Sequence, residues 1–340
     1  MSGDLKILVT GATGYVASHL LPELLKGKGR VRALVLPGEE DANLRSLGVE
    51  VVRGDLRDSP SLLSALKGID LCFHLAGINS FWIRHRRDYY EINVKGVRGL
   101  LEAAREAGVK RVVHTSSVVT IGEKKGEIGN EETTHRGYFL SHYEHSKYLG
   151  EKEALEMAGR DLEVVVLNPS SAYGPGRVTG SGKMFLDFLR GRLPGLFGGT
   201  INLLFIEDMV KGHLLAAERG RSGERYILAG ENLTVEEAFR AAAEIARLPA
   251  IPARIPAPLI WAICWSGHLR SLFTGKPPRL SRDQVRTLLH GIRVDSSKAR
   301  QELGLDFTPF AKGLARTIEG YRRANLIPPA DGNELGRRAS

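Results

Sequence analysis

Two side chains of this sequence are spaced for proton transfer. Tyr143 and Lys147 stand four residues apart in a segment of helical character, so that both lie on one helical face. A neighbouring ammonium group lowers the pKa of a phenol, and Tyr143 can then exchange a proton with a carbonyl or hydroxyl oxygen near neutral pH. Ser117 ends a predicted strand 26 positions before Tyr143 and offers a hydroxyl to the same oxygen. These three residues are the predicted catalytic group.

A second pair has the same spacing. Tyr148 and Lys152 begin five residues after Tyr143, so on one helix they face about 140° away from the first pair. Only one pair can face a site, and the hydroxyl of Ser117 favours Tyr143. We expect Tyr148 and Lys152 to form a solvated helix face.

A glycine-rich turn near the N-terminus predicts a dinucleotide site. The run from Thr10 to Ala17 follows an apolar strand and opens a helix. Gly11 permits a tight turn, Gly14 lets the backbone approach a pyrophosphate, and the helix N-terminus attracts that anion. Ala17 replaces the third glycine of the usual spacing and is still small. The predicted cofactor residues of this turn are Gly11, Thr13, Gly14, Tyr15 and Val16.

The identity of the dinucleotide stays open at this point. The second strand commonly ends in an acid that binds the ribose 2′-OH, or in an arginine that binds a 2′-phosphate. Here it ends at Leu36, with Arg32 inside the strand as a candidate ligand, so both NAD and NADP are considered. Asp55 and Leu56, after the third strand, are candidates for the adenine end, and the alternative for Asp55 is a plain helix N-cap.

Strands and helices that alternate along the first half position these residues. Continuous apolar strands separated by helices predict an α/β fold, a doubly wound parallel sheet of the Rossmann type. We predict a dinucleotide-binding domain over residues 1–167 and a smaller, discontinuous substrate lobe over 168–325, some of whose segments return to the sheet. Residues 326–340 are predicted to be a disordered tail. The expected strands are 5–9, 31–36, 50–52, 71–75, 111–114, 163–167 and 226–229, and the main helices 15–25, 94–107, 141–157, 233–247 and 309–324.

Composition excludes several classes of protein. The chain has 340 residues, 42% hydrophobic and 26% charged, which is typical of globular proteins and unlike disordered or disulfide-scaffold chains. The net charge of +9 is spread along the chain, and no nucleic-acid-binding module is visible. We expect no metal site, because no metal-ligand spacing is present. We also expect a cytoplasmic protein, because the two cysteines are distant and neither a signal peptide nor a membrane span is visible.

Several further motifs are similar to those of the extended short-chain dehydrogenase/reductase family, the NAD-dependent epimerase/dehydratase type. The similarity covers about residues 4–322. Within the family the chain most resembles the branch of dihydroflavonol reductases, 3β-hydroxysteroid dehydrogenases and hopanoid-associated sugar epimerases. These motifs are Phe73–Gly77, Asn93–Gly96, Asn168–Pro175, Phe205–Val210 and Asp295–Gly304.

The resemblance implies a role for each matched residue. Tyr143 would be the acid/base, Lys147 its tuner and a ligand of the cofactor ribose, and Ser117 the ligand of the substrate oxygen. Asn93 would lie near the adenosine and Pro169 would border the nicotinamide. The residues that would line the cofactor are Leu75, Ala76 and Gly77. A homodimer is also implied, whereas Leu36 departs from the arginine that the flavonol-reductase-like branch usually has.

The substrate lobe offers two chemistries. The apolar segment Trp261–Trp265 is either a helix that packs on the core, or a pocket or membrane-facing lid for a lipid-like alcohol. Nearby basic residues could meet anionic lipid headgroups: Arg270, Lys276, Arg279 and Arg282. Other arginines would suit a sugar-nucleotide diphosphate if they converged: Arg177, Arg254, Arg279, Arg286 and Arg293.

The sequence thus predicts an NAD(P)-dependent oxidoreductase that interconverts a secondary alcohol and a ketone. Its small-molecule substrate would be bulky and largely apolar, in the manner of a sterol, an isoprenoid or a polycyclic alcohol. The alternatives are an NAD-dependent sugar-nucleotide epimerase or dehydratase and, more remotely, a non-catalytic dinucleotide-sensing protein. Peripheral membrane contact is compatible with these readings, and a nucleic-acid partner is not expected.

Overall fold

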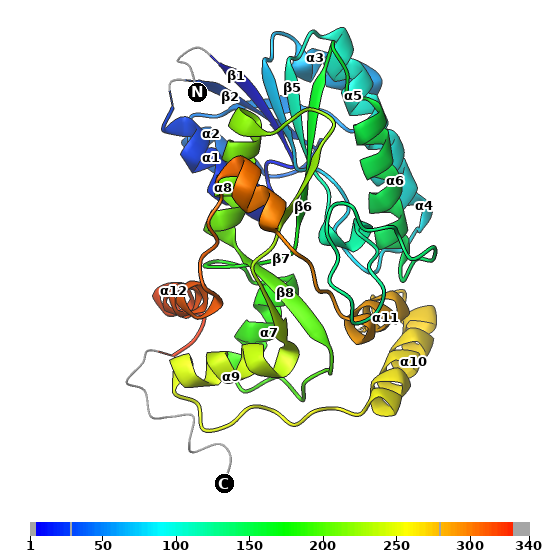
Figure 1. The fold of residues 1–340 in the computed structure, drawn as a ribbon, viewed down its shortest axis with the longest axis vertical. Coiled ribbons are helices and arrows are strands. Elements are labelled where there is room, and N and C mark those ends of the chain that lie inside the picture. Colours follow the sequence, from blue (N-terminus) through cyan, green and yellow to red (C-terminus); the bar gives the residue numbers. More distant parts are fainter. Residues whose placement is uncertain (1–4, 28, 279, 329–340) are drawn as a thin grey trace.

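A seven-stranded parallel sheet forms the upper part of the molecule (Figure 1). The computed structural model describes residues 5–27, 29–278 and 280–328. The strand order is β3-β2-β1-β4-β5-β6-β9, and every neighbouring pair is parallel. This confirms the predicted doubly wound sheet. Its strands are β1 (Lys6–Thr10), β2 (Arg30–Val35), β3 (Glu50–Arg53), β4 (Leu71–His74), β5 (Arg111–Thr115), β6 (Glu163–Pro169) and β9 (Arg225–Leu228).

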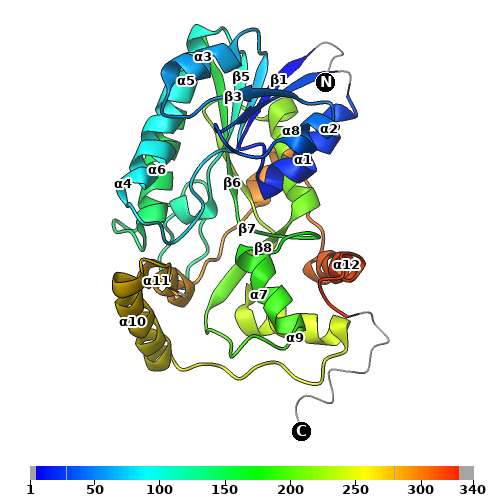
Figure 2. The same ribbon diagram turned by 180° about the vertical axis from the view of Figure 1, so that it is seen from behind.

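Helices cover both faces of this sheet (Figure 2). Alternate strand residues point to opposite faces, so Val9 packs beneath α1 (Tyr15–Leu25) while Leu8 belongs to the core beneath α3 (Ser59–Leu66). The first face also carries α2 (Ala42–Ser46) and α8 (Ile206–Arg219), and the second face carries α4 (Arg87–Tyr90), α5 (Val97–Glu106) and α6 (His142–Glu156). Burial on both sides explains why the strands read as continuous apolar runs.

A second, three-stranded sheet lies below the first. It has the order β10-β8-β7, antiparallel between β10 and β8 and parallel between β8 and β7. Helix α9 begins at an N-cap, where the Thr234 hydroxyl and the Glu237 carboxylate form a capping box. The elements of this part are β7 (Ser171–Tyr173), β8 (Thr200–Phe205), β10 (Glu231–Thr234), α7 (Gly180–Leu189), α9 (Val235–Ala246) and α12 (Phe310–Arg323).

Two helices, α10 (Ala257–Thr274) and α11 (Arg282–His290), project beside the second sheet and below α6 (Figure 1). They pack on each other through Ile260, Cys264 and Val285. Short helical turns complete the chain: π-helical segments at Glu91–Gly96 and Ala299–Leu303, and a 3₁₀ turn at Val118–Thr120. None of the helices within residues 5–27, 29–278 and 280–328 is long and apolar enough to cross a membrane.

One hydrophobic core joins the two halves of the chain. It runs from Val9 and Leu21 in the upper part to Phe205 and Leu314 in the lower part. Strand β9 and helix α8 come from the second half of the chain, and β9 pairs with β6 at the edge of the first sheet. The predicted tail starts too early, because Ile327 still packs into this core. Its remainder, 329–340, lies outside the described residues, as does Arg279.

Candidate active site at the carboxyl ends of the strands

The glycine-rich turn lies at the point where the strand order reverses. β1 runs into Gly11, whose φ of +65° is in the left-handed region that favours glycine. A Cβ at Gly11 would lie 2.8 Å from the backbone nitrogen of Ala76, so the turn packs directly on the segment that follows β4. β1 and β4 are neighbours, and the crevice outside their carboxyl ends is where open α/β sheets bind ligands.

The N-terminus of α1 is free to bind an anion. Its N-cap, Gly14, offers no side-chain hydrogen bond, and the first turn has no acidic residue. Helix α6, by contrast, is capped by the Ser141 hydroxyl, which accepts from the nitrogen of Glu144 at 3.0 Å. The first-turn N–H groups and the glycine cradle therefore fit the pyrophosphate of a dinucleotide.

The segment after β4 is held in place from two sides. The Thr10 hydroxyl lies 2.8 Å from Nδ1 of His74 and accepts from the nitrogen of Ala76 at 3.1 Å. The Asn93 side chain accepts from the nitrogen of Ile78 at 2.8 Å and donates to its carbonyl at 3.1 Å. Asn93 also donates to the hydroxyl of Ser146 on α6, at 3.0 Å. The structure thus brings Leu75, Ala76, Gly77 and Asn93 together between the glycine turn and α6.

Arg32 does not join this group. Its guanidinium donates to the carbonyls of Ala65 and Lys67 at 2.8 and 3.1 Å and pairs with Glu50 at 3.0 Å. Those partners lie toward the amino ends of the neighbouring strands, because Arg32 is in register with Glu50, the first residue of β3. The side chain therefore points away from the end where the glycine turn lies, and the sequence reading of Arg32 as a cofactor ligand needs correction.

Some of the other candidate cofactor residues make polar contacts within the protein, and others are packed against its core. Asp55 pairs with the guanidinium of Arg57 at 2.5 Å and accepts from its backbone nitrogen at 2.9 Å. The Tyr15 hydroxyl donates to the carbonyl of Pro175 at 3.0 Å and so ties α1 to the second half of the chain. Leu56 is buried in the core under α3, Val16 is partly buried against the other core, and Pro169 ends β6.

Ser117 and Tyr143 lie side by side at the ends of β5 and α6. Ser117 caps the 3₁₀ turn after β5, and Tyr143 is the second residue of α6. Burial raises the pKa of the Tyr143 phenol, opposite to the lowering that the sequence predicted from Lys147, and the neighbouring Ser117 hydroxyl opposes the effect of burial. The ring of Phe81 stands edge-on to Tyr143, with centroids 5.5 Å apart. A phenol and a hydroxyl therefore face the same space next to an aromatic wall.

Lys147 lies one helical turn beyond Tyr143. Its ammonium donates to the carbonyl of Thr115 at 2.8 Å and stands about 4.0 Å from where a Cβ of Gly77 would be. Burial lowers its pKa to about 8, and the nearby carboxylate of Glu151 opposes the shift. The structure therefore links the predicted catalytic group to the segment after β4.

The competing pair lies on another side of α6. The ring of Tyr148 packs against His135 and Phe139, with centroid distances of 4.8 and 5.4 Å, and Lys152 is exposed. Lys152 thus has the expected solvated position, whereas Tyr148 belongs to an aromatic cluster. Neither side chain faces the crevice that Tyr143 and Lys147 face.

Sequence reasoning missed the carboxylate behind the site. Buried Glu151 accepts hydrogen bonds from the side chains of Ser116 at 2.5 Å, Thr120 at 2.7 Å and Asn168 at 2.6 Å, and pairs with Arg225 at 3.0 Å. The same Thr120 and Asn168 side chains also donate to the carbonyl of Ser117, at 2.8 and 3.2 Å. Glu151 thereby fixes the backbone of Ser117. Its spacing of four residues from Lys147 was the available signal.

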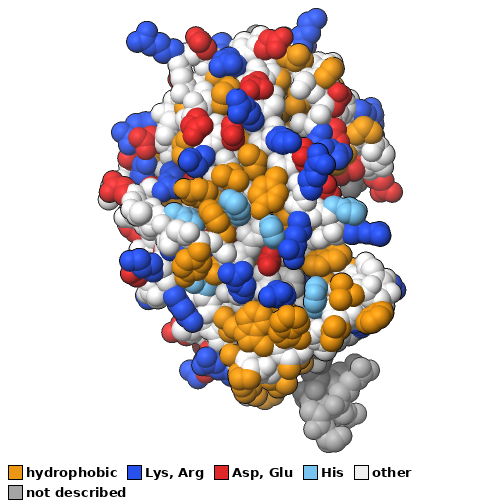
Figure 3. Space-filling view, turned by 90° about the vertical axis from the view of Figure 1, so that its right-hand side faces the viewer, with side chains coloured by type: hydrophobic (Ala, Val, Ile, Leu, Met, Phe, Trp, Pro, Cys, Tyr) orange, Lys and Arg blue, Asp and Glu red, His pale blue; other side chains and the backbone are white. Residues whose placement is uncertain are grey.

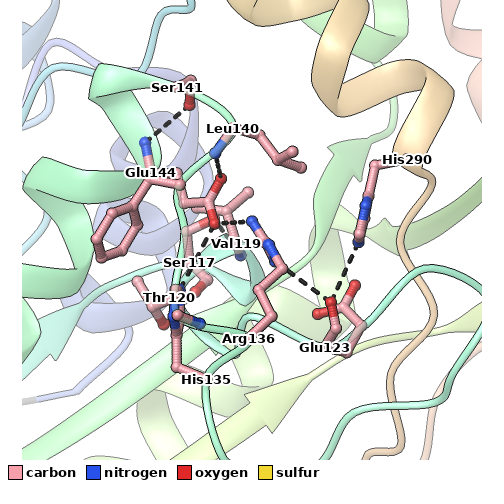
Figure 4. A network of polar contacts seen from close by, with 12 residues as sticks. Ser117, Val119, Thr120, Glu123, His135, Arg136, Leu140, Ser141, Glu144 and His290 are labelled. Atoms are coloured by element: carbon pink, nitrogen blue, oxygen red, sulfur yellow. Dashed lines mark hydrogen bonds and ion pairs between the residues drawn. The ribbon is translucent and has the colours of Figure 1, made fainter.

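A second buried network joins α6 to the lower half of the molecule (Figure 4). The Glu144 carboxylate is paired with Arg136 and accepts from the nitrogen of Leu140 at 2.9 Å. Arg136 also donates to the carbonyl of Glu123 at 3.3 Å, and His290 of α11 lies 3.1 Å from that carbonyl. Burial raises the pKa of Glu144 to about 7, although the charge of Arg136 lowers it. This network holds the start of α6.

Of the arginines that would suit a diphosphate, the four that the structure describes do not converge on one another. Arg177 stacks on Tyr15, Arg286 donates to the carbonyl of Phe139 at 3.2 Å, and Arg293 donates to that of Gly126 at 3.3 Å. Arg254 lines a separate cavity of about 320 Å³ beside α9. The described residues also contain no group of three or more His, Cys, Asp or Glu side chains that could hold a metal ion.

Comparison with known proteins gives a consistent result. Residues 7–229 match the NAD dependent epimerase/dehydratase family. The chain is 34% identical to sterol demethylase protein B of Methylococcus capsulatus, over 94% of this chain and 99% of that protein. It is 28% identical to 3beta-hydroxysteroid-dehydrogenase/decarboxylase isoform 1 of Arabidopsis thaliana, over 92% and 79%. Among solved structures, that of gox2253 superposes with a TM-score of 0.80 at 31% identity, covering 95% of this chain and 99% of that one.

Proposed function

The chain belongs to the NAD-dependent epimerase/dehydratase family and is a dinucleotide-dependent enzyme of the extended short-chain dehydrogenase/reductase type; from that premise, we propose that it interconverts a secondary alcohol and a ketone. One observation carries the proposal. The Tyr143 phenol lies beside the Ser117 hydroxyl, one turn from the Lys147 ammonium, at the strand ends where the glycine turn lies.

The residues divide the work of such a reaction. The glycine turn and the free N-terminus of α1 would hold the pyrophosphate, and Lys147 would hold the ribose. The bound nicotinamide supplies the hydride chemistry. In the reducing direction Tyr143 gives its proton to the substrate oxygen, and Ser117 donates a hydrogen bond to that oxygen. Burial raises the pKa of Tyr143, so at neutral pH the phenol carries the proton that the reducing direction requires.

An apolar substrate fits the surroundings best. The wall beside Tyr143 is aromatic. The names of the two relatives, which refer to sterols and hydroxysteroids, support a bulky substrate of that class. We therefore propose a sterol-, isoprenoid- or polycyclic-like alcohol or ketone as substrate.

A Tyr143→Phe variant tests the catalytic assignment. Without its hydroxyl the ring can neither give nor take a proton, so turnover of a cyclic ketone with NADH should fall by about a hundredfold or more. Dinucleotide affinity should change little, because the ring itself stays in place. Tyr148→Phe, the same change on the next turn of α6, is the matched control and should keep its turnover. Wild-type-like turnover by Tyr143→Phe would overturn the assignment.

The nucleotide content of the purified enzyme separates this function from that of a sugar-nucleotide epimerase or dehydratase, which the family name also covers. An epimerase stores and returns the hydride within one turnover, whereas a reductase exchanges its coenzyme in every cycle. We expect the denatured protein to release little nucleotide and the native protein to bind added NADH. Release of one NAD per chain would favour the epimerase.

A further inference from the structure

Helix α10 exposes a large apolar face. Only Ile260 and Cys264 of its 18 residues are buried. Phe273 is 89% exposed and Leu272 67%, and the helix contributes more than half of the exposed large hydrophobic side chains among the described residues. They are Leu259, Ile263, Trp265, Leu269, Leu272 and Phe273, here called the α10 face. Figure 3 shows them as a patch at the lower end of the molecule. A contiguous patch of this kind marks an interaction site.

The charged residues of the segment that carries the α10 face have one sign. No aspartate or glutamate occurs between Glu244 and Asp283, a stretch that contains six arginines and lysines. One of these, Arg282, stacks on the ring of Trp265 at 4.8 Å, and Lys and Arg side chains border the patch in Figure 3. Apolar side chains on a segment whose own charged residues are all cations are complementary to an anionic bilayer surface.

A polar cavity adjoins the same face. It has a volume of about 270 Å³ and lies between α11, the start of α6 and the segment before α4. Arg86, Arg282 and Arg286 line it together with Asp283. Because Arg282 also stacks on Trp265, this cavity offers cationic groups to a phosphate next to the α10 face.

We propose that the α10 face docks the enzyme on an anionic membrane surface. Its apolar side chains would enter the boundary between headgroups and acyl chains, while Arg270, Lys276 and Arg282 meet lipid phosphates. A second copy of the chain is a poorer occupant, because self-association through this face would set cation against cation. The helix lies in the surface, since none of the described helices is suited to span a membrane.

Docking would also bring the candidate site near the bilayer. At the start of α11, the hydroxyl of the N-cap Ser281 donates to the carbonyl of Phe81 at 3.1 Å, and Asp283 accepts from the nitrogen of His142 at 3.2 Å. Phe81 and His142 are the neighbours of Tyr143 in space and in sequence. An apolar substrate could then pass from lipid to Tyr143 over a short path. Only this consequence rests on the proposed function; the docking does not.

Vesicle co-sedimentation of the full chain tests the docking without any substrate. The probes are vesicles of phosphatidylcholine alone and of phosphatidylcholine with about 30% phosphatidylglycerol. We expect about tenfold more binding to the anionic vesicles, and a blue shift of tryptophan emission, because two of the three tryptophans are in α10. The double variant Leu272→Asp/Phe273→Asp should lose most of this binding, by about tenfold.

A matched control comes from the other half of the molecule. Leu47, before β3, is 45% exposed, and Leu47→Asp should bind vesicles like the wild type. The circular dichroism and NADH affinity of both variants should be unchanged, because the substituted side chains are on the surface. Failure of the wild type to bind either vesicle would overturn the proposal, as would equal binding to both. Concentration-dependent self-association that the double variant abolishes, without vesicle binding, would assign the face to a second copy instead.

Discussion

At the residue scale, the side chain with the greatest conflict between stability and chemistry is Lys147. Its ammonium is buried and donates to one carbonyl, that of Thr115. Burial lowers its pKa from 10.5 to about 8, so at neutral pH the folded chain carries a charge that water would solvate better. A group placed at such a cost is typical of functional sites.

Lys147→Met should therefore stabilise the protein while it abolishes turnover. Removing the buried charge should stabilise the fold by roughly 3 kcal/mol, the free energy that corresponds to the pKa shift. Losing the hydrogen bond to Thr115 should destabilise it by about 1 kcal/mol. We therefore expect a net gain of about 2 kcal/mol in the free energy of unfolding at pH 7. Between pH 8 and 10.5 only the unfolded wild type binds this proton, so the wild type gains stability there and the difference closes. Urea unfolding at pH 7 and pH 10 measures both effects. Exposed Lys152→Met is the control, and a less stable Lys147→Met at pH 7 would contradict the argument.

Some of these residues could be predicted from the sequence and others could not, because only some of them depend on local spacing. Tyr143, Lys147 and Gly11 are visible because their chemistry depends on local spacing along one helix or one turn. Glu151 looks like any helical carboxylate until the fold surrounds it with Asn168 and Arg225. Arg32 misleads because the sequence does not say toward which end of the strand its long side chain turns.

At the element scale, the predicted helices depend on local sequence signals, whereas the strands that were not predicted depend on partners far along the chain. Helix α1 occupies 15–25 as expected, because its apolar spacing and its glycine turn are local signals. β7 has three residues and β8 finds its partners far along the chain, pairing Leu203 with both Ser171 and Glu231. No periodicity within 174–199 could indicate that pairing, so the second sheet was missed.

The start of α6 depends on the ion pair between Arg136 and Glu144. Both side chains are almost completely buried, so Arg136→Ala leaves a buried carboxylate without its partner and should cost about 3–5 kcal/mol of stability. The pKa of Glu144, about 7 in the intact pair, should rise further. A raised folded-state pKa means that stability falls as pH rises through it, so the loss should be larger at pH 8.5 than at pH 6.

Urea unfolding at these two pH values measures the loss, and a second substitution identifies its cause. Arg136→Ala combined with Glu144→Gln removes the charge and should recover part of the stability at pH 8.5. Arg98→Ala breaks the exposed pair with Glu102 and should cost at most about 1 kcal/mol. A pH-independent loss in Arg136→Ala would show that the packing of the arginine, and not the charge of Glu144, is what matters.

At the scale of the whole molecule, the shared core couples the dinucleotide site to the entire fold. The cluster that contains Val9 also contains Phe205 and Leu314, so the two halves should unfold in one transition. A ligand bound at the glycine turn then stabilises the complete chain. At a concentration one hundred times its dissociation constant it contributes about 2.7 kcal/mol.

Thermal unfolding should therefore show one transition that moves up by roughly 4 °C with NAD, and by less with NADP at the same concentration. The reason is the charge after β2. Glu39 accepts from the Thr13 hydroxyl at 3.1 Å, and Arg53, which reaches the same loop, is paired with Asp41 at 2.6 Å. The 2′-phosphate of NADP would be repelled by the carboxylate of Glu39. A Leu36→Arg variant should add a cation beside that phosphate and so increase the shift with NADP. A larger shift with NADP in the wild type would contradict the charge argument, and two transitions of which only one moves would contradict the shared core.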